Sequence, residues 1–323
     1  MYNRRHLLGL AGASLLGTPA FAQGNEPFPS RAVSLVVPFT AGGPTDAVAR
    51  ALADALRPRL GQPVIVENKS GAGGAIAYEF VARSAPDGHT LLLAGASMTM
   101  TPALAKVNYD PVSSFAPVAQ VLELEIFLVV RPDLPVRTMH ELITYAKAHP
   151  GKLNYASVGN GSISHFQMEL FKSMAGLHMV HLPYRGASAA ITDFLGGQID
   201  LMFDSLANSG QYINNGKAKA LAVAGPTRSR VLPEVPTVAE AGLPGYEATA
   251  WTGILAAART PAAIVERLNR EVLAATTDPT FQQRVTAIGA RVAGAPTKDY
   301  AERIRTETTK WAALAKERGM REA

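Results

Sequence analysis

Short apolar runs alternate with longer amphipathic segments along the first third of the chain. The runs 32–37, 63–67 and 90–94 are rich in branched and aliphatic residues and have the length of strands. The segment 45–60 carries apolar residues every three or four positions and is followed by Gly61, which predicts a helix that ends there. Strands that alternate with helices in this way predict a mainly parallel, doubly wound sheet.

The same alternation starts again after a longer β-rich segment, 118–131, which we expect to be a strand that leaves the first unit. Thr138 and Glu141 then occupy the positions of a capping box at the start of a helix. The elements expected in this part of the chain are a helix at 138–149, a strand at 152–156, a helix at 162–175, a strand at 179–182, a helix at 188–195, and strands at 200–204 and 220–224.

The segment 233–245 contains three prolines and two glycines, a density that is typical of an irregular connection. The apolar run 248–257 follows it, and we expect this run to return to the first unit as a strand. Three helices are expected after that strand, at 261–276, 279–288 and 297–318.

These elements predict an α/β protein with two lobes, each a mainly parallel sheet flanked by helices. The first lobe is discontinuous and comprises residues 23–125 and 247–323, and the second lobe, residues 126–246, is inserted between its two parts. The chain crosses between the lobes twice. Paired crossings permit two lobes to close around a ligand about a hinge.

Residues 1–22 have the features of an export signal. Arg4 and Arg5 precede a largely apolar stretch that is too short to anchor the chain in a bilayer, and a small-x-small tripeptide at 20–22 predicts cleavage before Gln23. The adjacent arginines fit both a twin-arginine signal and a general secretory signal. We therefore expect an exported protein, with the route left open.

Composition limits the classes of function. The chain has no cysteine, so it has no disulfide, thiol nucleophile or thiolate metal site. It carries 31 basic and 26 acidic residues, and without Arg4 and Arg5 the net charge is +3. Because no run of basic residues is interleaved with aromatic ones, the sequence does not favour nucleic-acid binding. The weak positive balance is compatible with a small anionic ligand.

Two glycine-rich turns, 38–46 and 155–162, each follow a predicted strand and precede a predicted helix. Such a turn directs backbone N–H groups and the positive end of a helix dipole toward one point, which favours an anion there. The same residues could instead only cap the helices. The candidate ligand contacts are Phe39, Thr40, Ala41, Gly42, Gly43, Thr45 and Asp46 in the first turn, and Ser157, Asn160, Gly161 and Ser162 in the second.

Further candidates lie at the carboxyl ends of other predicted strands, where ligands bind in open α/β sheets. Arg185 could hold a carboxylate through two parallel hydrogen bonds, or form a surface or interlobe ion pair. Asp204 could accept a hydrogen bond from a ligand or orient the loops. The remaining candidates at these strand ends are Ser97, Met98, Tyr184, Gly186 and Ala187.

Signatures of enzymes are mostly absent from the sequence. It contains no nucleophile elbow, P-loop lysine motif or zinc-protease helix, and Ile76 stands where a dinucleotide fingerprint needs its last glycine. No cluster has the spacing of a metal site, so we expect neither a metal nor a cofactor. An exported hydrolase that uses Ser162, His165 and Asp204 is the alternative, although such a helical histidine is more often a packed residue.

Six motifs together resemble those of one family, the periplasmic solute receptors of the tripartite tricarboxylate transporter system, or Bug family. The resemblance covers essentially the whole chain after the signal segment. The motifs are VPFTAGGPTD at 37–46, VENKSGAGG at 66–74, PDGHTL at 86–91, YASVGNGS at 155–162, PYRG at 183–186 and LPEVPTVAEAG at 232–242.

The resemblance implies a two-lobe, Venus-flytrap binding protein of the periplasm, expected to be a monomer, that delivers a small organic carboxylate to a membrane permease. In the family, backbone groups and bound water hold one ligand carboxylate at the first-lobe loop, a role that maps onto 39–46 here. The second-lobe contacts map onto 157–162 and 184–187, with Asp204 nearby. A ligand-sensing role without transport is a further alternative.

The identity of the ligand stays open between C4–C6 dicarboxylates and aromatic acids. The segment 94–101 departs most from the family pattern, in which small polar residues are more frequent. Met98 and Met100 are expected to make this wall of the pocket more apolar, which argues against a plain citrate receptor.

Overall fold

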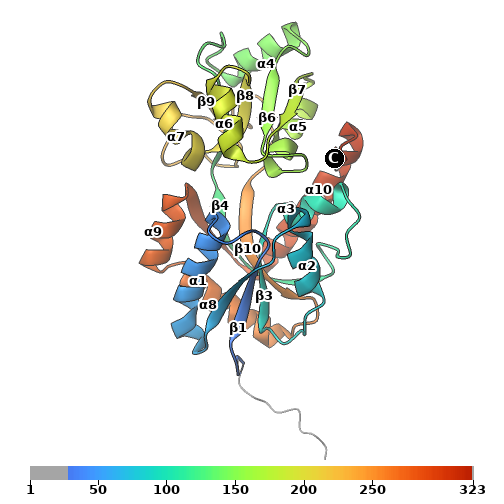
Figure 1. The fold of residues 1–323 in the computed structure, drawn as a ribbon, viewed down its shortest axis with the longest axis vertical. Helices are drawn as coiled ribbons and strands as arrows, with labels where there is room; N and C mark the ends of the chain where they lie inside the picture. The colour runs from blue at the N-terminus through green and yellow to red at the C-terminus, as the bar shows by residue number, and fades with distance from the viewer. Residues whose placement is uncertain (1–27, 322–323) are drawn as a thin grey trace, which may run out of the picture.

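The computed structural model describes residues 28–321, so the expected signal segment 1–22 and the cleavage position before Gln23 lie outside the described residues. The described chain forms two lobes, each built on one β-sheet (Figure 1). The strands of the first sheet come from residues 33–124 and 250–295, and those of the second from residues 126–223.

The first sheet has six strands in the order β11-β4-β10-β3-β1-β2. β1 pairs in parallel with β2 and β3, whereas β10 is antiparallel to β3 and β4, and β11 is antiparallel to β4. β4 carries the chain toward the second lobe and β10 returns beside it, so the sheet is mixed. The strands are β1 (Val33–Val37), β2 (Val64–Asn68), β3 (Thr90–Gly95), β4 (Phe115–Leu124), β10 (Ala250–Ala257) and β11 (Ala290–Ala295).

The second sheet has five strands in the order β7-β6-β8-β5-β9. β6 is parallel to β7 and β8, and β5, which enters from the first lobe, is antiparallel to β8 and β9. The expected single strand 118–131 is thus two strands in two sheets, β4 and β5, separated at Glu125. The strands are β5 (Ile126–Val130), β6 (Asn154–Ser157), β7 (Val180–Pro183), β8 (Leu201–Ser205) and β9 (Lys219–Val223).

Helices flank both sheets (Figure 1). Half of the expected capping box is present: the Thr138 hydroxyl accepts from Glu141 N, but the Glu141 carboxylate accepts from Arg137 N, one residue before the N-cap. The helices are α1 (Pro44–Leu60), α2 (Ala75–Ala82), α3 (Ser97–Met100), α4 (Met139–Ala148), α5 (Ile163–Ala175), α6 (Ala187–Leu195), α7 (Leu206–Asn214), α8 (Ala262–Ala275), α9 (Pro279–Ala287) and α10 (Thr297–Arg318). In the described part of the chain, no helix has the length and apolar character that crossing a bilayer requires.

α10 contacts both lobes. It packs on β4 of the first sheet and on α5 of the second lobe. The rings of Trp311 and Phe166 meet edge to face at 5.5 Å, and Arg318 Nε lies 2.8 Å from Glu169 Oε2. The Ser173 hydroxyl donates to Glu317 Oε1 at 2.6 Å. The lobes are therefore joined by a helix as well as by the two chain crossings.

Gly253 leaves room for close packing in the middle of β10. A Cβ atom at this position would lie 2.5 Å from Tyr300 Cζ and 2.8 Å from the Ala119 carbonyl oxygen. We expect Gly253→Ala to lower the free energy of unfolding by about 1–3 kcal/mol, because it overpacks this site. Chemical denaturation measures the change. Gly95→Ala in β3 is the control, since its Cβ would make an ordinary 3.6 Å contact, and equal effects of the two variants would contradict this account.

Candidate functional site

The carboxyl ends of the parallel strands in both sheets face the gap between the lobes. Gly95 at the end of β3 pairs with Thr252, near the point where β10 re-enters the first lobe. Ser205 at the end of β8 pairs with Ile126, the first residue of β5 after the crossing. The loops that follow these strands therefore lie at the ends of the two lobes that face each other (Figure 1).

The first-lobe loop joins β1 to α1 and is shaped by Asp46. This buried carboxylate accepts from Arg50 Nε at 2.8 Å, from Gly42 N at 3.0 Å and from Asn68 Nδ2 at 3.0 Å. The bond from Arg50 is the main reason why the pKa of Asp46 falls to about 2. Asn68 also donates to the Phe39 carbonyl at 3.0 Å. The oxygens of Asp46 are thus committed to the loop itself.

The rest of this loop is mostly exposed. Gly43 is the N-cap of α1, has extended backbone and provides no side-chain cap, so the amino end of α1 is available to an anion. Of the candidates here, Phe39, Thr40, Ala41 and Gly42 are exposed and Gly43 and Thr45 are half-buried.

The second-lobe loop between β6 and α5 satisfies much of its own backbone. Ser162 caps α5 by accepting from His165 N at 3.4 Å, and Asn160 is exposed. Four N–H groups of the loop have internal acceptors: Val158 donates to Ser164 Oγ, Gly159 to Ser157 Oγ, Gly161 to His165 Nδ1, and Ser162 to the Gly159 carbonyl. This loop therefore forms a fixed wall more than a set of free donors.

The amino end of α6 is open by contrast. Its N-cap, Gly186, has a positive φ of 102° and provides no side-chain cap. Ala187 and Ala190 from this helix line a small concave space of about 10 Å³. The other residues that line it are Ala156, Ser157, Val158, Ser164, Met202, Phe203 and Asp204. The first turn of α6 can thus offer N–H groups to an anionic group at the opening of this space.

Asp204 stands at the end of β8 in the same space. Its carboxyl accepts from Asn208 Nδ2 at 2.9 Å and from the Ser209 hydroxyl, so it also orients the start of α7. Burial raises the pKa of Asp204. A carboxyl group that is more easily protonated repels a bound anion less and can donate a hydrogen bond to it.

The other candidates occupy different surroundings. The Ser97 hydroxyl bonds to the Tyr78 hydroxyl at 2.8 Å, and Tyr184 donates to Asp193 Oδ2 at 2.8 Å. Arg185 is exposed beside the open end of α6. The side chains of Met98 and Met100 are fully buried in the hydrophobic core, because α3 turns them inward, so they do not form a surface wall.

The residues of the alternative hydrolase do not form a catalytic relay. The Ser162 hydroxyl donates to the Gly159 carbonyl at 2.7 Å, and the His165 ring accepts from Gly161 N at Nδ1. Asp204 is engaged with the start of α7. A serine nucleophile needs its histidine base within hydrogen-bond reach, so this geometry does not support the hydrolase. Within residues 28–321, no three histidine, aspartate or glutamate side chains are grouped to hold a metal ion.

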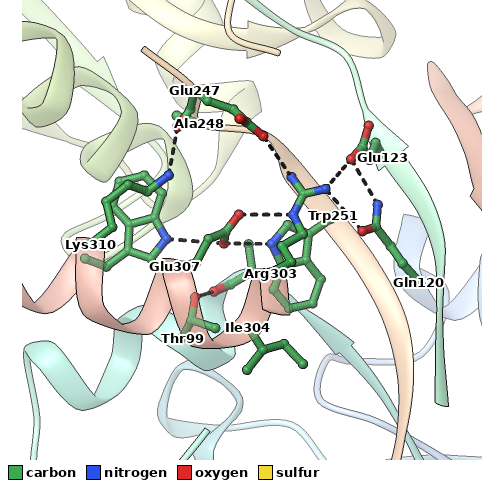
Figure 2. Close-up of polar contacts among 12 residues, drawn as sticks. Thr99, Gln120, Glu123, Glu247, Ala248, Trp251, Arg303, Ile304, Glu307 and Lys310 are labelled. Atoms are coloured by element: carbon green, nitrogen blue, oxygen red, sulfur yellow. Dashed lines mark hydrogen bonds and ion pairs between the residues drawn. The ribbon is translucent and has the colours of Figure 1, made fainter. Parts of the chain in front are cut away.

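A polar cluster, buried except for Glu247, lies where the two crossings meet the first lobe (Figure 2). Arg303 of α10 pairs with Glu123 at the end of β4, with Glu307 at 3.2 Å and with Glu247, just before β10, at 3.8 Å. Trp251 Nε1 donates to Glu307 Oε2 at 2.7 Å. The Arg303 guanidinium thus bonds to the end of β4 and reaches the second crossing through the longer ion pair with the exposed Glu247.

Comparison with known proteins matches most of the chain to one family. The profile described as "Tripartite tricarboxylate transporter family receptor" (TctC) matches residues 48–320. A UPF0065 protein encoded between tcbD and tcbE in Pseudomonas sp. strain P51 is 37% identical, over 96% of this chain and 93% of that protein.

Three solved structures share the fold at 28–37% identity. Rpa4515 of R. palustris with adipate has a TM-score of 0.75 at 35% identity and covers 92% of this chain and 100% of its own. MatC of Rhodopseudomonas palustris with bound malate has a TM-score of 0.72 at 37% identity, and the match covers 89% of this chain and 99% of MatC. A TctC solute-binding protein from Polaromonas, with no ligand, has a TM-score of 0.83 at 28% identity, and the match covers 90% of this chain and 99% of that protein.

Proposed function

Because the chain belongs to the tripartite tricarboxylate transporter receptors of the Bug family, we propose that it captures a small organic carboxylate between its lobes and delivers it to a membrane permease. Members of this family are periplasmic binding receptors, not enzymes. Relatives at 35% and 37% identity hold adipate and malate, which supports a dicarboxylate or a related acid as the ligand here.

The observation that carries this proposal is the placement of two open helix ends on opposite sides of one gap. The amino end of α1 belongs to the first lobe and that of α6 to the second, and neither has a side-chain cap. A ligand with carboxylates at both ends can accept hydrogen bonds from the N–H groups of both lobes at once. Each helix end contributes about 0.3–1 kcal/mol when exposed, and more when the site closes and excludes water.

We infer that binding of the ligand brings the two lobes together. The chain matches the ligand-free Polaromonas structure with a higher TM-score than the two carboxylate-bound structures, although its sequence is less similar to it. This supports an arrangement of the lobes that resembles the ligand-free state. Since the anion gains contacts from both lobes only when they approach, its binding shifts the population toward the closed form, which the permease would recognise.

Export to the periplasm belongs to the same proposal. The signal features of residues 1–22 and the predicted cleavage before Gln23 support it, as does the location of the family. We propose that the mature protein acts as a monomer, because one chain supplies both sides of the gap.

Calorimetry of the purified mature protein tests the proposal. We expect at least one acid from a panel of C4–C6 dicarboxylates, citrate and aromatic acids to bind in the micromolar range or tighter, with one site per chain. The amide or methyl ester of the best ligand should bind at least about 100-fold more weakly, because it lacks the negative charge that the amino ends of the helices stabilise. Absence of binding by every acid in the panel would contradict the proposed class of ligand.

A further inference from the structure

Three aromatic rings form a stack behind the second-lobe loop. The ring of Tyr155 from β6 lies 4.7 Å from that of His181 on β7, with 13° between the planes. The ring of His181 in turn lies 4.0 Å from that of His165 on α5, with 14° between the planes. The first pair follows from strand register, since Tyr155 and His181 are direct partners in the parallel pairing of β6 and β7.

Both imidazoles bond to the loop. Gly161 N donates to His165 Nδ1 at 3.2 Å, so this nitrogen must carry a lone pair and the proton of the neutral ring is on Nε2. His181 Nε2 lies 2.7 Å from the hydroxyl of Ser157, which lines the space at the open end of α6. The loop is therefore attached to the stack at two points, one on each side of Gly159.

The position of this loop matters to both lobes. A Cβ atom added at Gly161 would lie 2.5 Å from Leu104 Cδ1, so the loop backbone already touches the first lobe there. Ser157 and Val158 form part of the wall of the ligand space. A shift of Gly161 would thus change both the interlobe contact and the wall.

We propose that His165 and His181 are positioning residues, which hold the second-lobe loop in the shape that receives a carboxylate, and that the hold is lost when His165 becomes charged. The inference rests on the proposed function. A protonated His165 cannot accept from Gly161 N, because both of its ring nitrogens then carry protons. Two charged imidazoles stacked at 4.0 Å would also repel each other.

The charged groups around the stack have opposite effects on the protonation of the two histidines, and these effects partly cancel. Glu169 accepts from the Tyr155 hydroxyl at 2.6 Å, from Lys172 Nζ at 2.5 Å and from Arg318 Nε at 2.8 Å. Its carboxylate favours protonation of the histidines, whereas Lys172 opposes it. Burial raises the pKa of Tyr155, which therefore stays a neutral phenol.

The direction of the pH effect follows from the two histidines. Burial lowers the pKa of His165 below its usual 6.5, and burial together with the neighbouring His165 lowers the pKa of His181 to about 4. The native loop thus binds fewer protons than an opened loop, so its stability is complete above pH 6.5 and declines as the pH falls below that value. Carboxylate affinity should decline with it.

The test compares two substitutions at His165. In His165→Asn, an amide oxygen can take the place of Nδ1 and accept from Gly161 N without titrating, whereas His165→Leu removes the acceptor. Adipate and malate serve as probes, measured by calorimetry at pH 7.5 and 5.0. We expect the wild-type protein to lose about five- to tenfold more affinity over this range than His165→Asn, the equivalent of one hydrogen bond. His165→Leu should bind more weakly than His165→Asn at both pH values.

The ratio between variants removes the titration of the probe itself, since both proteins meet the same acid. Equal losses in the wild-type protein and His165→Asn would overturn the inference. A second measurement needs no ligand: nitrogen NMR should find Nδ1 of His165 unprotonated at pH 7.5, and exchange of the Gly161 amide should accelerate beyond its intrinsic pH dependence as His165 titrates. A protonated Nδ1 at pH 7.5, or Gly161 exchange that does not respond to His165, would also overturn it. If neither probe binds, the full panel of acids decides the proposed function, and the NMR result decides the inference.

Discussion

Replacement of Arg303 by methionine should lower the free energy of unfolding by about 3–5 kcal/mol, because it leaves the buried carboxylate of Glu307 without its ion-pair partner and that of Glu123 with Arg291 alone. The side chains of Glu123 and Glu307 are 7% and 6% exposed, and each pairs with Arg303. Methionine retains much of the apolar stem but supplies no charge. Burial of an unpaired carboxylate is costly enough to dominate the packing change. Urea denaturation at neutral pH, followed by circular dichroism, measures the effect.

Arg305→Met is the matched control on the same helix. Arg305 pairs with Glu302, and these side chains are 65% and 57% exposed, so the loss should be below about 1 kcal/mol. If the two variants lose the same stability, the cluster in Figure 2 does not have the energetic role we assign to it. Because Arg303 also holds Glu247, the variant should loosen both crossings, which small-angle scattering of the folded protein can detect as a broader distribution of interlobe distances.

Replacement of Ala187 by aspartate should weaken carboxylate binding by about 100-fold or more. Ala187 is the first residue of α6 and lines the proposed ligand space, so the new carboxylate would take the place of the ligand's own charge. Two like charges about 4 Å apart cost about 4 kcal/mol at an effective dielectric constant near 20. An acidic residue in the first turn favours the helix, so the fold should not suffer.

Ala189→Asp provides the control for Ala187→Asp. It adds the same charge to the same turn of α6, but Ala189 is exposed and does not line the space. Calorimetry with the best acid from the panel measures both variants, and thermal unfolding verifies that both are folded. We expect less than about a threefold change for Ala189→Asp. Binding by Ala187→Asp at the wild-type level would place the ligand elsewhere and reject the open end of α6 as its site.

Sequence periodicity predicted most of the strands and helices, because local propensity and burial agree in them. It missed elements that depend on tertiary pairing. β11 contains three alanines and a glycine, which are weak strand formers, and it is a strand because it pairs with the edge of β4. The antiparallel strands of the mixed sheets also depend on where the chain crosses, which the local pattern does not encode.

The side-chain contacts within the candidate site also depend on tertiary pairing. The turns at 38–46 and 155–162 were recognisable from their glycines, but the partners that occupy their polar groups were not. Asn68 reaches Asp46 from 22 positions away, and its role depends on the pairing of β1 with β2. His181 carries no local signal, since its contact with Ser157 exists only because β6 and β7 are adjacent.

The C-terminal helix has a consequence for protein engineering. The strands of the second sheet come from one continuous stretch, residues 126–223, so a graft of that stretch from another receptor looks like a simple way to exchange ligand preference. Yet Trp311, Glu317 and Arg318, which lie outside that stretch, contact α5. A working chimera must therefore carry the matching face of α10 from the same donor as the grafted lobe.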